Sequence, residues 1–299
     1  MNSDIIWPSL PYDEWKDTFE ALHMKMQIIG KVKLELTPFL NQWWNVAFYF
    51  NASGITTGLI HYKDIMFEIN IDFINHETIT LTSDNRRTVT ALYNCSVAEF
   101  YDSFMNSLKS LGINVTINTL PSEVPNPVHC YKDNRSSYDK EYVSRLRQIL
   151  IYTYKIFEQF QSGFTGKSSP VQFFWGSFDL SYSRFSGKLA EPPKQGGRIM
   201  RYSENEENFA SGFWPGNANY PEPAFYSYIY PSPKRIENVK IKPPAFYDSK
   251  LGLFILDYDD VRKAEKPDEL ILEFLNSTYE ASAKLSGWDL VFLKTEIPV

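Results

Sequence analysis

The sequence contains little cysteine or histidine and no long hydrophobic run. Its 299 residues include two cysteines, Cys95 and Cys130, and four histidines. Two cysteines outside any C-x-x-C arrangement exclude a disulfide framework and favour a reducing, cytoplasmic environment. The histidines are scattered along the chain, so neither a metal site nor a cofactor is predicted. No segment approaches the roughly 20 apolar residues of a membrane-spanning helix, and a membrane partner is therefore not expected.

The chain also contains fewer basic than acidic residues. The chain has 30 lysine and arginine residues against 36 aspartate and glutamate residues, a formal net charge of −6. Nucleic-acid binding depends on clustered basic side chains that neutralise phosphates, so a nucleic-acid partner is not predicted. The P-loop and the motifs G-x-S-x-G, G-x-G-x-x-G and H-E-x-x-H are absent too, so the enzyme classes that they identify are not predicted.

The chain does have apolar and aromatic residues, 43% and 16% of the total, which are enough to form a sizeable core. Apolar residues at three- and four-residue spacing predict a helix that begins after residue 11 and ends at Gly30. Further helices are predicted over 96–112, 138–161 and 267–287, the first of them with Ser96 and Glu99 in a capping box. Alternating apolar residues predict strands at 31–37, 45–50, 65–73, 77–83, 86–92, 113–117, 170–176, 178–185, 224–230 and 251–256.

These elements follow the same order in two parts of the chain. Residues 1–120 form a first half and residues 138–299 a second, and the proline-rich residues 121–137 are typical of a linker. The predicted fold class is α+β, with two similar halves, each an antiparallel sheet flanked by helices, related by internal duplication and pseudo-twofold symmetry. The alternative is an unduplicated α+β fold whose parts align only loosely. A long insertion at 189–223 distinguishes the second half.

Four short motifs carry a family resemblance. They are WPSLP at 7–11, FFWGSFDL at 173–180, GFWPG at 212–216 and EPAFY at 222–226. On these motifs the chain resembles, over nearly its whole length, an uncharacterised bacterial family known as a domain of unknown function. The resemblance implies no activity, so function has to be inferred from the residues themselves.

Residues 170–188, PVQFFWGSFDLSYSRFSGK, combine aromatic side chains with an acid and two bases. Taken as an extended strand, residues 170–180 place Trp175 and Asp179 on one face. A carboxylate on an apolar face needs a partner, and Arg184 or Lys188 could supply it. Asp179 is then either an anchor or general acid/base inside a cleft, or a structural residue that caps a turn or forms an ion pair.

Aromatic side chains also gather at two later positions. Alternation places Tyr226 and Tyr228 on one face of the strand at 224–230, where phenol rings either stack on a ligand or simply favour the strand. The GFWPG motif predicts a tight turn that projects Phe213 and Trp214. These two side chains either fill the core or cover a pocket.

Three functions follow from these residues. The leading hypothesis is binding of a small aromatic or apolar metabolite in a cleft of the second half. Its predicted ligand-binding residues are Trp175, Arg184, Lys188, Phe213, Trp214, Tyr226 and Tyr228. The second is an enzyme of unknown reaction with Asp179 or Glu222 as acid/base, and the third is a non-catalytic module that binds a protein through exposed aromatic side chains. The sequence predicts no oligomeric state.

Overall fold

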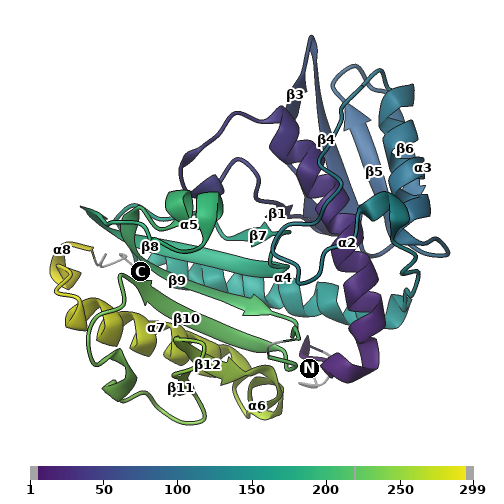
Figure 1. Cartoon of the computed structure of the whole chain (residues 1–299). Coiled ribbons are helices and arrows are strands. Elements are labelled where there is room, and N and C mark those ends of the chain that lie inside the picture. Colours follow the sequence, from purple (N-terminus) through teal and green to yellow (C-terminus); the bar gives the residue numbers. More distant parts are fainter. Residues whose placement is uncertain (1–5, 219, 294–299) are drawn as a thin grey trace.

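The computed structural model of the chain describes residues 6–218 and 220–293. It contains two antiparallel sheets with helices packed against them, which confirms the α+β fold class. The first sheet lies beside α3, and the second lies beside α4 and α7 (Figure 1). Within the described residues no helix is both long enough and apolar enough to cross a bilayer.

The first sheet has the strand order β1-β2-β4-β5-β6, with β3 paired to β4. Its strands are β1 (Tyr49–Phe50), β2 (Gly54–Thr56), β3 (Ile60–Tyr62), β4 (Ile65–Asp72), β5 (Glu77–Thr82) and β6 (Arg87–Ala91). Helix α3 (Val97–Ser110) begins with the capping box predicted from the sequence, because the Ser96 hydroxyl accepts from the Glu99 backbone N–H and the Glu99 carboxylate accepts from Ser96.

The second sheet has the strand order β11-β12-β10-β9-β8-β7. Its strands are β7 (Gln172–Phe174), β8 (Asp179–Leu189), β9 (Glu206–Trp214), β10 (Ala224–Tyr230), β11 (Phe246–Asp248) and β12 (Leu253–Asp257). The helices of this part are α4 (Lys140–Ser162), α5 (Gly197–Ser203), α6 (Tyr258–Lys263), α7 (Pro267–Leu285) and α8 (Leu290–Leu293). Short 3-10 turns occur at η1 (Asn41–Trp43), η2 (Cys130–Lys132) and η3 (Ile236–Asn238).

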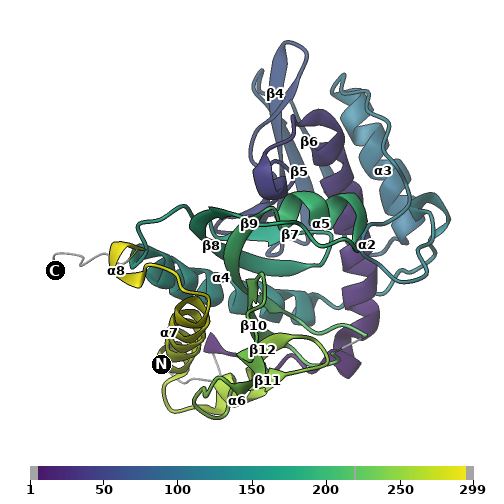
Figure 2. The same ribbon diagram turned by 60° about the vertical axis from the view of Figure 1, so that its left-hand side comes forward.

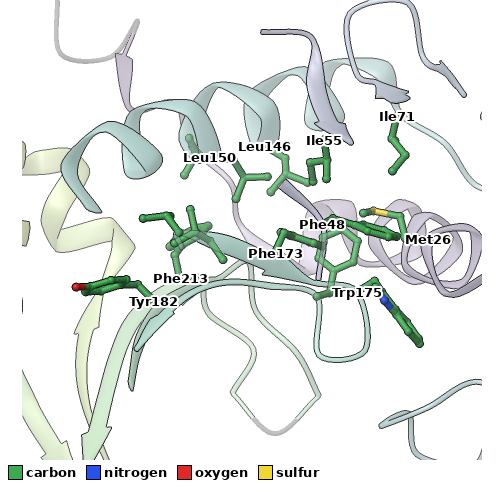
Figure 3. Close-up of a cluster of buried hydrophobic side chains, with 14 of the residues drawn as sticks. Met26, Phe48, Ile55, Ile71, Leu146, Leu150, Phe173, Trp175, Tyr182 and Phe213 are labelled. Atoms are coloured by element: carbon green, nitrogen blue, oxygen red, sulfur yellow. The ribbon is translucent and has the colours of Figure 1, made fainter. Parts of the chain in front are cut away.

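Helices α4 and α7 cover one face of the second sheet, whereas α5 lies on the other (Figure 2). On the covered face Tyr182 of β8 packs against Phe160 of α4, and the ring of Phe209 of β9 packs against Tyr279 of α7. Figure 3 shows Leu146 and Leu150 of α4 pointing toward the aromatic side chains of this face. Helices α4 and α7 therefore contact only one of the two faces of this sheet among the described residues.

The two sheets are joined by backbone pairing and share a hydrophobic core. Phe48, just before β1, and Phe173 of β7 exchange two backbone hydrogen bonds of 2.8 Å each. Their side chains are buried and lie side by side (Figure 3). Residues of both sheets thus belong to a single cluster of buried side chains.

Helix α2 (Tyr12–Leu36) is longer than the sequence predicted. It continues through Gly30, so the predicted helix end at Gly30 and the predicted strand at 31–37 are wrong. The physical reason is a close contact, because a Cβ on Gly30 would lie 2.1 Å from the Trp175 indole ring. Glycine is therefore needed here for packing and not for a helix cap. The predicted strand at 113–117 is also wrong, although Ile113 and Ile117 are buried.

The segment 189–223, expected to be a long loop, contains α5 and the central strand β9. Its strand pattern is weak because the residues that face away from the helices are small or polar: Asn208, Ala210 and Gly212 alternate with Phe209, Ser211 and Phe213. The first three residues of GFWPG, Gly212 to Trp214, accordingly end β9, so Phe213 and Trp214 do not project from a tight turn.

Candidate functional site

A cavity of about 770 Å³ lies on the face of the second sheet that α4 and α7 leave free. Strands β7 to β10 form its floor. Residues of α5 and the segment 42–46 form one wall, and residues 122 and 123 approach from another side. The volume falls within the range of roughly 300–1,000 Å³ that is common for sites of small organic molecules. We call this space the sheet cavity.

Three aromatic rings are stacked along the floor of the sheet cavity. The ring centroids of Trp214 and Tyr226 are 4.8 Å apart with an interplanar angle of 17°, and those of Tyr226 and Tyr228 are 6.5 Å apart at 15°. The tyrosines are neighbours on one face of β10, as the alternation predicted. The Trp214 Nε1–H donates to the backbone oxygen of Glu222 at 3.2 Å, which fixes the indole ring.

Asp179 begins β8 beside this aromatic stack. Its two carboxylate oxygens accept hydrogen bonds from the hydroxyl groups of Ser177 and Tyr226. The side chain is buried and lines the sheet cavity, and this burial raises the pKa of the carboxyl group above its usual range, although both hydroxyl donors oppose the shift.

Glu204 is a second buried carboxyl group at the sheet cavity. It follows α5 and accepts hydrogen bonds from the Tyr228 hydroxyl at 3.1 Å and from Asn208 Nδ2 at 2.7 Å. Burial raises the pKa of this group as well. Glu204 was not predicted as a site residue, because it lies in a segment without helical or strand periodicity of its own.

Glu123 brings a third carboxyl group from the proline-rich segment. Its side chain is exposed and lines the cavity, and desolvation by surrounding protein atoms together with the negative charge of Asp179 raises its pKa. Gln27 of α2 holds this segment in place, since its amide accepts from the Ser122 backbone N–H at 3.0 Å and donates to the Ser122 oxygen at 2.8 Å. A Cβ on Gly176 would lie 2.1 Å from the carboxylate of Glu123, so glycine makes room for it.

Helix α2 holds the turn between β7 and β8 in place through the side chain of His23. His23 Nε2 lies 3.0 Å from the backbone oxygens of both Trp175 and Gly176, so this nitrogen carries the proton and donates. Burial lowers the pKa of His23 to about 4, which keeps the ring neutral near pH 7. The indole N–H of Trp175 donates to the Val46 oxygen at 3.0 Å. Trp175 is thereby held as a wall of the sheet cavity.

Among the described residues, one buried polar atom at the sheet cavity has no partner. Gln172 of β7 is 1% exposed and lines the cavity, and its Oε1 accepts no hydrogen bond from any of these residues. A buried amide oxygen without a donor is costly, by about 1–3 kcal/mol. The lining therefore contains a buried acceptor that has no donor from the described residues.

Five of the predicted site residues line one cavity, namely Trp175, Asp179, Trp214, Tyr226 and Tyr228. Two predictions about how these residues are arranged are wrong. Trp175 and Asp179 do not alternate on one strand, because a turn separates β7 from β8 and pairs Asp179 with Phe174. Arg184 does not form an ion pair with Asp179 either. Its guanidinium lies on the opposite face of the sheet, 3.5 Å from the Phe160 ring centroid.

The remaining predicted residues lie outside the lining of the sheet cavity. Phe213 is buried among Phe225 and Tyr258 on the helix-covered face. Lys188 is exposed near the end of β8, and Glu222 is exposed between β9 and β10. Glu222 contacts the lining through its backbone oxygen, which accepts from the Trp214 indole N–H.

Charges around the sheet cavity are unbalanced. Its lining includes four acidic side chains, Glu35, Glu123, Asp179 and Glu204, and one basic side chain, Arg198. No group of three potential metal ligands occurs among residues 6–218 and 220–293. The sheet cavity is thus lined by acidic and aromatic side chains.

Comparisons with known proteins place the chain in a family but give no activity. Searches of the curated proteins and of the solved structures found no match. The model of a family of unknown function, DUF5996, matches residues 7–295. This match covers nearly all of the chain and agrees with the resemblance carried by the four sequence motifs, so the chain belongs to the DUF5996 family.

Proposed function

We propose that this protein binds a small organic molecule in the sheet cavity. The observation that carries the proposal is the combination of a volume of about 770 Å³ with an ordered aromatic stack and buried polar groups in one lining. Ligand sites in proteins are mostly apolar and aromatic, with a few fixed polar groups that orient the ligand. Trp214, Tyr226 and Tyr228 supply the first element, and Gln172, Asp179 and Glu204 the second.

The concave shape of the site favours binding of a small molecule over binding of a protein. Docking of a protein through aromatic side chains needs an exposed apolar patch. The aromatic side chains at issue instead face a cavity, and Tyr226 is 7% exposed. The three rings are therefore better suited to enclose a small molecule than to cover a flat partner surface.

An enzyme that uses Asp179 as an acid is the second candidate. The raised pKa of this cavity-facing carboxyl group favours it. Both carboxylate oxygens, however, are already engaged by the hydroxyl groups of Ser177 and Tyr226. A general acid has to turn a free proton toward the substrate, so this geometry supports binding more than proton transfer.

The test is a thermal-shift screen against a metabolite library with two matched variants. Ala210→Phe places a ring on the cavity floor, because Ala210 of β9 lines the cavity and is 4% exposed. Ala91→Phe adds the same ring to an exposed position on the edge strand β6. We expect compounds that raise the melting temperature of the parent and of Ala91→Phe but not of Ala210→Phe. If no compound stabilises the parent, or if hits stabilise Ala210→Phe equally, the proposal is wrong.

Three features of the sequence analysis stay predictions. The two sheets differ in strand order, so internal duplication with pseudo-twofold symmetry is not confirmed. The domain boundaries at 120 and 138 and the cytoplasmic location are also predictions. Expressing the segments 1–120 and 138–299 separately would test the boundaries. Because residues of both segments belong to one hydrophobic core, we expect that neither segment folds alone.

A further inference from the structure

The chemistry of the sheet cavity specifies the charge of its ligand. Asp179 and Glu204 are buried at its floor, and each accepts a hydrogen bond from a tyrosine hydroxyl of β10. The pKa of Tyr228, which lies between them, is raised by burial and by the negative charges of Glu204, Asp179 and Glu123. All three carboxyl groups therefore act on the same small region of the cavity.

In the part of the chain that the structure describes, no basic side chain forms an ion pair with these carboxyl groups. Across residues 6–218 and 220–293, none of the ion pairs includes Glu123, Asp179 or Glu204. The basic residue of the lining, Arg198, is exposed on α5, and its guanidinium lies 5.7 Å from the ring centroid of Trp43. Buried carboxylates without a cation are costly, so a bound cation would lower the free energy of the site.

The side-chain amide of Gln172 also favours a ligand that donates hydrogen bonds. The unpartnered Gln172 Oε1 is an acceptor, and it is buried in the cavity lining independently of the carboxyl groups. An amide oxygen and carboxylates accept hydrogen bonds, so a ligand that contacts them has to be a donor. An ammonium or guanidinium group supplies several donors and a positive charge, and no acceptor.

The aromatic walls suit a cation that also carries an apolar group. Trp214, Tyr226 and Tyr228 present π systems beside the carboxyl groups, and Trp175 adds a fourth ring. Aromatic faces attract cations and pack against flat apolar groups. From these observations we infer that the ligand of the sheet cavity is an organic cation, an amine or guanidine attached to an aromatic or other apolar group. This inference rests on the proposed function and narrows it to one class of ligand.

The experiment compares tryptamine, tryptophol and indoleacetate, which share an indole ring and carry a cationic, a neutral and an anionic end. Binding to the parent protein is measured by calorimetry near pH 7. We expect tryptamine to bind at least about tenfold more tightly than tryptophol, because charge-assisted hydrogen bonds and cation–π contacts are lost in the alcohol. Indoleacetate, which brings a further negative charge, should bind more weakly still.

Two variants assign the preference to the cavity carboxyl groups. Glu204→Gln removes one of these charges and keeps the shape of the side chain, and Asp179→Asn does the same beside Tyr226. The matched control is Glu222→Gln, which removes an exposed carboxylate outside the cavity lining. We expect the preference for tryptamine to fall several-fold in each cavity variant and to persist in the control. Glu204→Gln and the parent comparison keep the test valid if Asp179→Asn does not fold.

The outcomes separate the two proposals. If tryptophol or indoleacetate binds as tightly as tryptamine, and Ala210→Phe abolishes that binding, the cavity is a ligand site but the inferred charge is wrong. If the preference for tryptamine is unchanged in Glu204→Gln and Asp179→Asn, the assignment to these groups is also wrong. If none of the three compounds binds and the metabolite screen yields no stabilising compound, both proposals are wrong.

Discussion

Replacement of Gly30 by alanine tests the packing that fixes the wall of the sheet cavity. A Cβ at this position would lie 2.1 Å from Cδ2, 2.2 Å from Cε2 and 2.4 Å from Cγ of Trp175. Carbon atoms in ordinary contact are about 3.5–4.0 Å apart, so the indole ring would have to move by more than about 1 Å. The ring is 4% exposed and is held by its hydrogen bond to the Val46 oxygen.

Two effects of opposite sign decide the result. Helix propensity alone favours alanine over glycine by about 1 kcal/mol inside a helix. Overpacking of a filled core costs about 1–3 kcal/mol, and loss of the indole hydrogen bond costs about 1 kcal/mol more. We therefore expect Gly30→Ala to lower the free energy of unfolding by about 2 kcal/mol. Urea denaturation followed by circular dichroism and tryptophan fluorescence measures this difference.

The control is Gly163→Ala at the end of α4. Gly163 has a φ of −83°, and the nearest atom to its added Cβ would be the Phe160 oxygen at 4.0 Å. This substitution should leave stability unchanged or raise it slightly. In a Trp175→Leu background the cost of Gly30→Ala should shrink, because the clashing ring is absent. A gain in stability for Gly30→Ala in the parent protein would refute the reasoning.

Two further predictions concern buried polar groups near the same wall and floor. Because the pKa of His23 is lowered from 6.5 to about 4, the unfolded chain binds a proton between these values that the folded chain does not, so stability falls as pH falls. When the pH is lowered from about 7 to about 5, the free energy of unfolding of the parent should fall by about 2 kcal/mol more than that of His23→Gln, as measured by urea denaturation. The control is His61→Gln at an exposed position, which should show the same loss as the parent. Parallel pH profiles for His23→Gln and the parent would contradict this. Tyr226→Phe removes one of the two hydroxyl donors to Asp179 and should cost about 1–3 kcal/mol near neutral pH, and less in acid where the carboxyl group is protonated. Tyr230→Phe, whose hydroxyl donates to a neutral backbone oxygen, is the comparison, and an equal loss in both variants at every pH would argue against a charged Asp179.

The sequence predicted those features that depend on local pattern. The tyrosine row of β10 follows from alternation, which is maintained wherever a strand pairs regularly on both sides, as β10 does with β9 and β12. The start of α3 follows from the capping box, whose hydrogen bonds join residues three apart. Such signals are complete within a short segment of chain, so a single sequence contains them.

Features that depend on distant contacts were missed. Gly30 has the appearance of a helix end until Trp175, far along the chain, is known to pack against it. Glu123 reaches the cavity because Gln27 of α2 holds the adjacent backbone. The position of Glu204 depends on the placement of α5 across the sheet. In each case the informative partner is remote in sequence, and local periodicity carries no trace of it.

The number of residues between Asp179 and Arg184 explains why the cavity keeps its negative charge. On a regular strand, residues an odd number of positions apart point to opposite faces, and these two are both on β8 with regular pairing to their neighbours. Arg184 is consequently buried against the aromatic rings of Phe160 and Tyr279, on the face covered by α4 and α7. Opposite charges on one strand are thus kept apart by the thickness of the sheet. The guanidinium is stabilised by aromatic faces, whereas the Asp179 carboxylate accepts from the hydroxyl groups of Ser177 and Tyr226 on the cavity side, where it is not paired with Arg184.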